Sequence, residues 1–258
     1  MKKWLNDFSV TGISIELEDG VVIIRYGERI FEIFSDLEAR DRYIALLDAL
    51  DKDPEVKVVL SLNEHGCLGE EPYDKYINKL SGQNKPVDLE TLWQIQENTG
   101  RSRQLCFHHQ TITKRLASKK LIIDGLQGTV VTPFFGESLS ADIRFVSEDL
   151  CFSLAHKKYG LHPTGGLAYF LPRFVGQGRA NEILLTIDVI NAKLALDLGL
   201  VSRIFANEDF ESSCIRTAKE LAELSPATIE TKKNYLFMMR KRCMIILNRR
   251  QNGSIGSR

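Results

Sequence analysis

The sequence predicts an α/β fold, and three segments carry that prediction. Residues 13–17 alternate between apolar and polar side chains, and Asp19-Gly20 then turns the chain into the apolar run 21–24, which is typical of a β-hairpin. Residues 37–62 contain a helical pattern followed by a buried strand, so strand, helix and strand succeed one another and favour a parallel sheet. Residues 210–247 have the pattern of two long helices, so the last part of the chain is expected to be helical.

The first helix is expected over residues 37–50, where leucines recur at helical spacing and acidic residues gather in the first turns. Asp53-Pro54 ends it, and the nearly continuous apolar run 56–62 predicts a strand buried on both faces. A Gly-rich, charged loop is expected over residues 63–71. Ser225-Pro226 predicts a helix start, and Gly199 a helix end. The other expected helices are 89–97, 105–116, 135–141, 180–185, 192–198, 210–224 and 227–247, and the other expected strands are 121–126, 143–146 and 150–153.

Length and composition are those of an ordinary soluble enzyme. The chain has 258 residues, 43% of them apolar and 26% charged, and its formal net charge is zero, so no overall field favours nucleic acid. No apolar run is long enough for a membrane span, and residues 1–9 are too polar for a signal peptide. The five cysteines are scattered without a C-x-x-C pair, which indicates reduced thiols and a cytoplasmic location.

Four motifs stand in the second half of the chain: residues 141–145 (ADIRF), 160–166 (GLHPTGG), 171–176 (LPRFVG) and 190–203 (INAKLALDLGLVSR). In their order and spacing they resemble the motifs of the crotonase (enoyl-CoA hydratase/isomerase) superfamily. Weaker similarity extends back to about Glu18, whereas Tyr26-Gly27-Glu28-Arg29 replaces the usual N-R-P stretch after the second strand.

The resemblance implies a spiral of ββα turns over residues 1–200 and a helical trimerisation region over residues 201–258, within one functional unit. It also implies homotrimers or dimers of trimers, and a pocket for an acyl-CoA or another acyl thioester. In that pocket two backbone N–H groups, the oxyanion hole, would stabilise an enolate. Coenzyme A would be part of the substrate, and no separate cofactor or metal is expected.

The resemblance places the first oxyanion donor on Glu70, in the segment Leu68-Gly69-Glu70-Glu71. A carboxylate beside the developing oxyanion would oppose catalysis unless the side chain turned away. The alternative is a solvated loop glutamate with no role in chemistry. The resemblance also implies that Gly69, Glu71, Pro133, Thr164 and Gly165 line the substrate pocket.

The second donor position falls on Pro133, which has no N–H, and the usual catalytic glutamate of that helix becomes Gly136. A shift of one residue would restore both functions, through the Phe134 N–H and the carboxylate of Glu137. The alternative is a plain helix start, because proline suits the first turn of a helix.

The other catalytic glutamate of the superfamily falls on His156, and the aspartate that some members use falls on Thr164. An imidazole can act as a general acid or base near neutral pH, so His156 is the leading catalytic candidate. A lone histidine is more often structural or exposed. His162 and His65 are weaker candidates. Cys106-x-His108-His109 does not predict a metal site, because adjacent side chains point apart on a helix.

Residues 232–258 contain eight Lys or Arg and no acidic residue. Lys232, Lys233 and Arg240 could bind the phosphates of coenzyme A, as this helix can in relatives, or they could simply form a solvated face. The sequence thus leaves two hypotheses open. One is an enzyme that acts on an acyl thioester through an enolate, by hydration, isomerisation or decarboxylation. The other is a crotonase-fold binding or scaffold protein that has lost catalysis.

Overall fold

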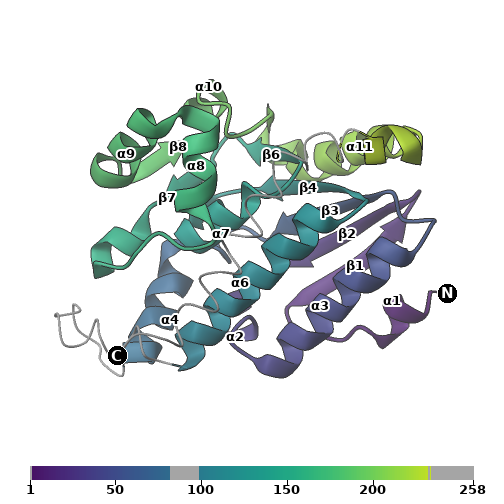
Figure 1. The fold of residues 1–258 in the computed structure, drawn as a ribbon, viewed down its shortest axis with the longest axis horizontal. Coiled ribbons are helices and arrows are strands. Elements are labelled where there is room, and N and C mark those ends of the chain that lie inside the picture. The colour runs from purple at the N-terminus through teal and green to yellow at the C-terminus, as the bar shows by residue number, and fades with distance from the viewer. Residues whose placement is uncertain (1, 82–98, 232, 234–258) are drawn as a thin grey trace.

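A six-stranded sheet forms the centre of the molecule, and the computed structural model describes residues 2–81, 99–231 and 233 (Figure 1). Its strand order is β1-β2-β3-β4-β6-β9. The β1–β2 pair is antiparallel, and every other neighbouring pair in this sheet is parallel. The strands are β1 (Ile13–Glu18), β2 (Val21–Tyr26), β3 (Val58–Asn63), β4 (Leu121–Leu126), β6 (Ile143–Ser147) and β9 (Arg203–Phe205). The predicted hairpin and the predicted parallel unit are both confirmed.

The hairpin turn depends on two residues with left-handed backbone. Asp19 has φ 48° and Gly20 has φ 81°, which is the combination that a two-residue turn needs to match the twist of its strands. Helix α3 (Leu37–Lys52) begins at Leu37 because the side chain of Asp36 accepts a hydrogen bond from the Ala39 N–H at 2.8 Å.

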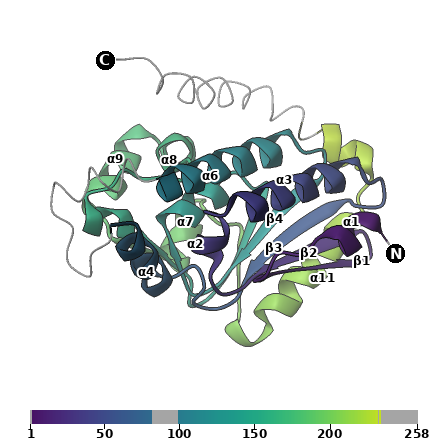
Figure 2. The same cartoon turned by 90° about the horizontal axis from the view of Figure 1, so that it is seen from below.

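Besides a helix that begins at Pro226, the described parts of the chain contain ten α-helices and two short 3-10 helices. The helices are α1 (Lys3–Asp7), α2 (Ile30–Ile33), α3 (Leu37–Lys52), α4 (Glu70–Ser81), α6 (Thr99–Ala117), α7 (Thr132–Ser138), α8 (Leu167–Val175), α9 (Gln177–Thr186), α10 (Ala192–Asp197), α11 (Phe210–Ala222), η1 (Ala155–Tyr159) and η2 (Asn207–Asp209). Figure 2 shows α3 and α6 side by side over one face of the sheet and α11 against the other.

The buried strand β2 shows how the two faces are filled. Val22 and Ile24 belong to the large apolar core under α3 and α6, whereas Val21 and Ile23 pack with Phe210 of α11 in a second core. A strand covered on both faces needs apolar residues at every position, which explains its continuous apolar run.

A small second sheet lies beside the main one and feeds directly into α7. It consists of β5 (Thr129–Val131), β7 (Cys151–Ser153) and β8 (Val189–Asn191), with β5 and β7 parallel and β7 and β8 antiparallel. Only β7 was expected, because strands of three residues are too short to show alternation.

Helix α7 begins at Thr132 and not at residue 135, because Pro133 fits the first turn of a helix. Near the end of the chain a helix begins at Pro226, and Ser225 caps it by accepting a hydrogen bond from the Thr228 N–H at 3.2 Å. The predicted helix 89–97 and most of the predicted helix 227–247 lie outside the described residues.

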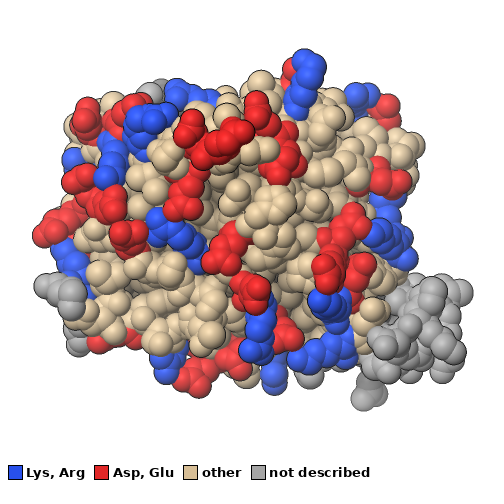
Figure 3. Space-filling view, turned by 180° about the vertical axis from the view of Figure 1, so that it is seen from behind, with Lys and Arg blue, Asp and Glu red and all other residues tan. Residues whose placement is uncertain are grey.

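Acidic and basic side chains are interspersed on the face seen in Figure 3, as the balanced composition predicts. Within the described ranges, no helix is both long enough and apolar enough to cross a bilayer.

Candidate functional site

The two segments that carry the predicted oxyanion donors lie directly against each other. The Val131 N–H donates a hydrogen bond to the Leu68 carbonyl oxygen at 3.0 Å. Helix α4 begins two residues after Leu68, at Glu70, and α7 begins one residue after Val131, at Thr132. A single main-chain hydrogen bond therefore fixes the starts of two helices side by side.

The first turns of both helices present main-chain N–H groups. The first N–H groups of a helix have no carbonyl partner within it and carry partial positive charge. Glu70 is the first residue of α4. In α7 the second residue is Pro133, which has no N–H, and the next donor is that of Phe134. Phe134 is buried, and its ring packs on Phe31 at a centroid distance of 5.1 Å.

The side chain of Glu70 reaches the end of β7 and the 3-10 helix η1 that follows it. Its Oε1 accepts a hydrogen bond from the Ser153 hydroxyl at 2.6 Å, and its Oε2 is paired with the Lys158 ammonium. Burial raises the pKa of the Glu70 carboxyl, but the hydrogen bonds from Lys158 and Ser153 outweigh burial and leave the pKa lowered. Glu70 is therefore an ionised, oriented carboxylate at neutral pH and not a solvated loop residue.

His156 lies inside the protein, with only 3% of its surface exposed. Its Nδ1 and the Thr132 hydroxyl are 2.7 Å apart. The same hydroxyl donates to the Ser153 carbonyl oxygen at 3.2 Å, so it accepts from His156, whose Nδ1 carries the proton. The structure thus joins His156 to the first turn of α7 through Thr132.

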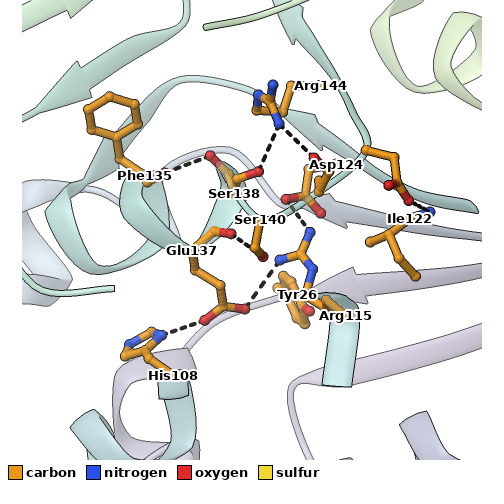
Figure 4. Close-up of polar contacts among 12 residues, drawn as sticks. Tyr26, His108, Arg115, Ile122, Asp124, Phe135, Glu137, Ser138, Ser140 and Arg144 are labelled. Carbon is orange, nitrogen blue, oxygen red and sulfur yellow. Dashed lines mark hydrogen bonds and ion pairs between the residues drawn. The ribbon is translucent and has the colours of Figure 1, made fainter. Parts of the chain in front are cut away.

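Glu137 is also buried, and it faces α6 (Figure 4). His108 Nδ1 donates to Glu137 Oε2, and Arg115 Nη1 lies 3.4 Å from Glu137 Oε1. Arg115 Nη2 also donates to Asp124 Oδ2 at 2.5 Å. Two cationic or potentially cationic side chains of α6 thus meet two carboxylates, one on α7 and one on β4.

Opposing effects act on the charges of this buried network. Burial lowers the pKa of Arg115, but the attraction of Asp124 and Glu137 is larger and raises it. Burial raises the pKa of Asp124, and Arg115 opposes that shift only in part. Removing any one of these charged side chains should therefore destabilise the fold, because it would leave a buried charge without its partner.

The Gly-rich loop 160–166 packs against α7 and explains two glycines. A Cβ on Gly165 would lie 1.9 Å from the Pro133 carbonyl oxygen, and a Cβ on Gly136 would lie 2.6 Å from the Thr164 carbonyl oxygen. Gly136 is therefore required by close packing of the loop on the helix, at the place where the superfamily pattern has a glutamate. The structure brings Pro133, Thr164 and Gly165 together at this contact.

Comparison with known proteins identifies the family. The family model for enoyl-CoA hydratase/isomerase matches residues 88–244, which is more than half of the chain. The chain belongs to the enoyl-CoA hydratase/isomerase family. The predicted resemblance is confirmed by this match.

Individual relatives are distant. The chain is 26% identical over 210 residues to a 4-chlorobenzoyl coenzyme A dehalogenase of an Arthrobacter species, covering 81% of this chain and 72% of that protein. It is 35% identical over 117 residues to a probable enoyl-CoA hydratase of Mycobacterium tuberculosis, covering 45% of this chain and 41% of that protein. The long match therefore has low identity, and the match with higher identity spans less than half of either protein.

Solved structures of the family share the fold. An enoyl-CoA hydratase/isomerase from Cupriavidus metallidurans superposes with a TM-score of 0.70 at 24% identity, covering 97% of this chain and 90% of that one. An enoyl-CoA hydratase from Mycobacterium avium subsp. paratuberculosis gives 0.73 at 20% identity, covering 94% and 88%. The predicted crotonase-like α/β fold is thus confirmed.

Two cavities flank the start of α4 in this member of the enoyl-CoA hydratase/isomerase family. One, of about 480 Å³, lies beyond β2 and β3 and is lined by Glu28, Arg29 and Glu71 among others. Glu71 is paired there with Lys75 at 2.7 Å. The other, of about 340 Å³, is lined by Glu70, Ser153 and Lys158 among others.

The predicted phosphate-binding residues are only partly described. Lys233 is bound inside the protein, where its ammonium lies 2.9 Å from Asp142 Oδ2 and donates to the Lys120 carbonyl oxygen. Lys232 and Arg240 lie outside the described residues. Among the residues that the structure describes, no three His, Cys, Asp or Glu side chains are grouped to hold a metal ion.

Several residues around the site were not singled out from the sequence. Asp124 sits in an apolar strand, and a polar residue in a buried strand implies a buried partner. That signal pointed to the existence of a partner such as Arg115 but not to its identity. Ser153 and Lys158 gave no signal at all.

Proposed function

We propose that this protein binds an acyl thioester, with coenzyme A as the expected carrier, and holds its carbonyl oxygen between the N–H groups of Glu70 and Phe134. The observation that carries the proposal is the hydrogen bond from Val131 to Leu68, which places the first turns of α4 and α7 next to each other. Donors aimed at one point stabilise an enolate more than they stabilise a neutral carbonyl. The reaction class is therefore enolate formation at the carbon next to the thioester.

The donor of α4 can be removed without disturbing the helix. Glu70 is the first residue of α4, a position that tolerates proline, so Glu70→Pro deletes the N–H and keeps the helix start. Glu70→Ala deletes the same carboxylate and keeps the N–H, so it is the matched control. One hydrogen bond is worth about 0.5–1.5 kcal/mol, so butyryl-CoA should bind Glu70→Pro about 2- to 10-fold more weakly than Glu70→Ala in calorimetry.

The thioether analogue S-butyl-CoA has no carbonyl oxygen and should bind the two variants equally. If butyryl-CoA also binds them equally, the Glu70 N–H is not a donor. If the unaltered protein binds neither ligand at millimolar concentration, the proposal as a whole fails.

Hydration of crotonyl-CoA is expected to be very weak or absent. Hydratases of this family hold one water between two carboxylates, whereas here those positions carry Gly136 and His156, and Glu137 is engaged by His108 and Arg115. Loss of positioned acid–base groups costs a factor of roughly 10² to 10⁴ in rate. Turnover of crotonyl-CoA at the rate of an ordinary hydratase, followed by its absorbance, would contradict this expectation.

The second candidate function is thioester binding without turnover, as a binding or scaffold protein. The buried contacts of Glu137 and His156 favour it, because both side chains are enclosed and hydrogen-bonded to other protein groups. Exchange of the protons next to the thioester carbonyl separates the two functions. In heavy water an enolate-forming enzyme exchanges these protons for deuterium, and a binding protein does not.

Assembly into a trimer or a dimer of trimers and a cytoplasmic location are further parts of the proposal. The apolar side chains of Leu185, Val189 and Leu196 are exposed on the single chain, which fits burial against a partner subunit. Light scattering at micromolar concentration should therefore give a mass of three or six chains, and a monomer mass would exclude both assemblies.

A further inference from the structure

The cavity of about 340 Å³ beside α4 contains an ionised carboxylate for which the family pattern has no role. Glu70, Ser153, Lys158 and Asp188 are among the residues that line it. The Glu70 side chain is 34% exposed, so it faces the cavity and solvent as well as its two partners. Glu70, whose main-chain N–H is the first proposed donor, therefore also presents a carboxylate to this cavity.

The carboxylate is held in one orientation from two sides. Ser153 is buried, with 2% of its surface exposed, and its hydroxyl donates to Oε1 at 2.6 Å. The Lys158 ammonium is paired with Oε2. The neighbouring Lys157 is instead paired with Asp188 at 2.7 Å. The second ammonium group that lines the cavity therefore has its own carboxylate partner and does not compete for Glu70.

The Glu70 carboxylate need not repel the enolate, because it is paired with a cation. Lys158 offsets the negative charge of Glu70, and the pair as a whole is neutral until the carboxylate takes up a proton. After proton uptake the Lys158 charge is no longer offset, so the pair carries a net positive charge. The pair therefore does not add negative charge at the step where the enolate forms.

The two leading catalytic candidates from the sequence, Glu137 and His156, are less accessible than Glu70. Glu137 and His156 are only 4% and 3% exposed, and both are engaged by buried partners. Glu70 combines exposure to a cavity, fixed orientation and closeness to a proposed oxyanion donor.

We infer that Glu70 is the catalytic acid–base residue of this site, with Ser153 and Lys158 as its positioning residues. This inference rests on the proposed thioester binding. The Cα–H bond next to the thioester carbonyl breaks, its proton moves to Glu70 Oε, and its electron pair forms the enolate with the negative charge on the carbonyl oxygen. Return of the proton to carbon reverses the step, or carries it to a different carbon of a conjugated acyl group.

The test is deuterium exchange of butyryl-CoA in heavy water, followed by proton NMR, beside calorimetric binding of the same ligand. Glu70→Gln keeps the N–H and the shape of the side chain and should bind butyryl-CoA as the unaltered protein does. Its exchange rate should fall by a factor of about 10² or more. Glu182→Gln removes an exposed carboxylate that is likewise paired with a cation, Arg179 on α9, and it should exchange at the unaltered rate.

The positioning residues are tested by the pH dependence of exchange. Lys158→Met removes the charge that lowers the pKa of Glu70, so the acid limb of the rate profile should move to higher pH, an effect that simple destabilisation does not produce. Ser153→Ala should lower the exchange rate with the affinity retained.

Exchange by Glu70→Gln within threefold of the unaltered rate would overturn the inference and leave the proposed binding intact. Binding by the unaltered protein without any exchange would overturn it too, in favour of a binding protein. Absence of binding would remove the proposed function itself.

Discussion

The buried network of His108, Arg115, Asp124 and Glu137 should dominate the effect of charge substitutions on stability. In Arg115→Met a buried cation is replaced by an apolar side chain of similar length, and Asp124 and Glu137 lose their shared partner. The side chains of all three are at most 7% exposed, so water cannot replace the lost charge. Breaking one partner out of a buried pair costs about 3–5 kcal/mol.

Thermal and urea unfolding at neutral pH should show this loss. For a chain of this size 1 kcal/mol corresponds to roughly 2–4 °C in Tm, so Arg115→Met should melt about 6–20 °C lower. Arg179→Met is the matched control, because Arg179 pairs with Glu182 at 2.7 Å but is 43% exposed. An exposed pair of this kind is worth about 0–1 kcal/mol, so the control should melt within a few degrees of the unaltered protein.

The pH dependence of the deficit identifies its cause. Burial raises the pKa of Asp124, and without Arg115 nothing of equal size opposes that rise, so the variant is favoured at low pH and loses stability as pH rises. The gap between Arg115→Met and the unaltered protein should therefore grow from pH 4 to pH 7. A deficit below about 1 kcal/mol, or one that is equal at both pH values, would refute the assignment of stability to this network.

Three further substitutions test the contact of Asp53 with Trp4 and the contact of the Gly-rich loop with α7. The Trp4 indole N–H is the main cause that lowers the pKa of Asp53 to about 2, so Asp53 stabilises the protein above pH 4 and this contribution is lost as pH falls towards 2. Asp53→Asn should lower the urea midpoint at pH 7, and its difference from the unaltered protein should narrow from pH 4 to pH 2. Gly165→Ala should cost about 2–5 kcal/mol, because φ is +65° and the new Cβ meets the Pro133 carbonyl oxygen, whereas Gly178→Ala, with open space around it, should gain about 0.5–1 kcal/mol. Equal effects of the two alanines would contradict the contact of the loop with α7.

Long periodic segments made the fold predictable from the sequence. The hairpin, the helix at residues 37–50 and the buried strands were all specified by local alternation, helical spacing and turn residues, and each is present. Helix α4 was missed because its polar sequence follows a Gly-rich loop. Strands β5 and β8 were missed because pairing with β7, and not their own pattern, makes them strands.

The site was less predictable than the fold because its contacts join distant parts of the chain. No local pattern indicated that Glu137 pairs with His108, or Glu70 with Ser153 and Lys158. It did indicate the donor shift from Pro133 to Phe134, since proline lacks an N–H. That shift of one residue remains a prediction about chemistry, although the helix start on which it depends is now described.

The hydrogen bond between Val131 and Leu68 has a consequence for how this site could change over time. A site made of main-chain amides is unaffected by most side-chain substitutions, because the donating N–H groups belong to the backbone. Glutamate or proline can therefore replace the residues that are usual in the family while the main-chain framework persists. A position-by-position comparison of aligned sequences would interpret such replacements as loss of the site. The matching chemical probe is semisynthesis with an α-hydroxy acid at position 134, which exchanges one amide for an ester and deletes a single N–H while every side chain stays in place.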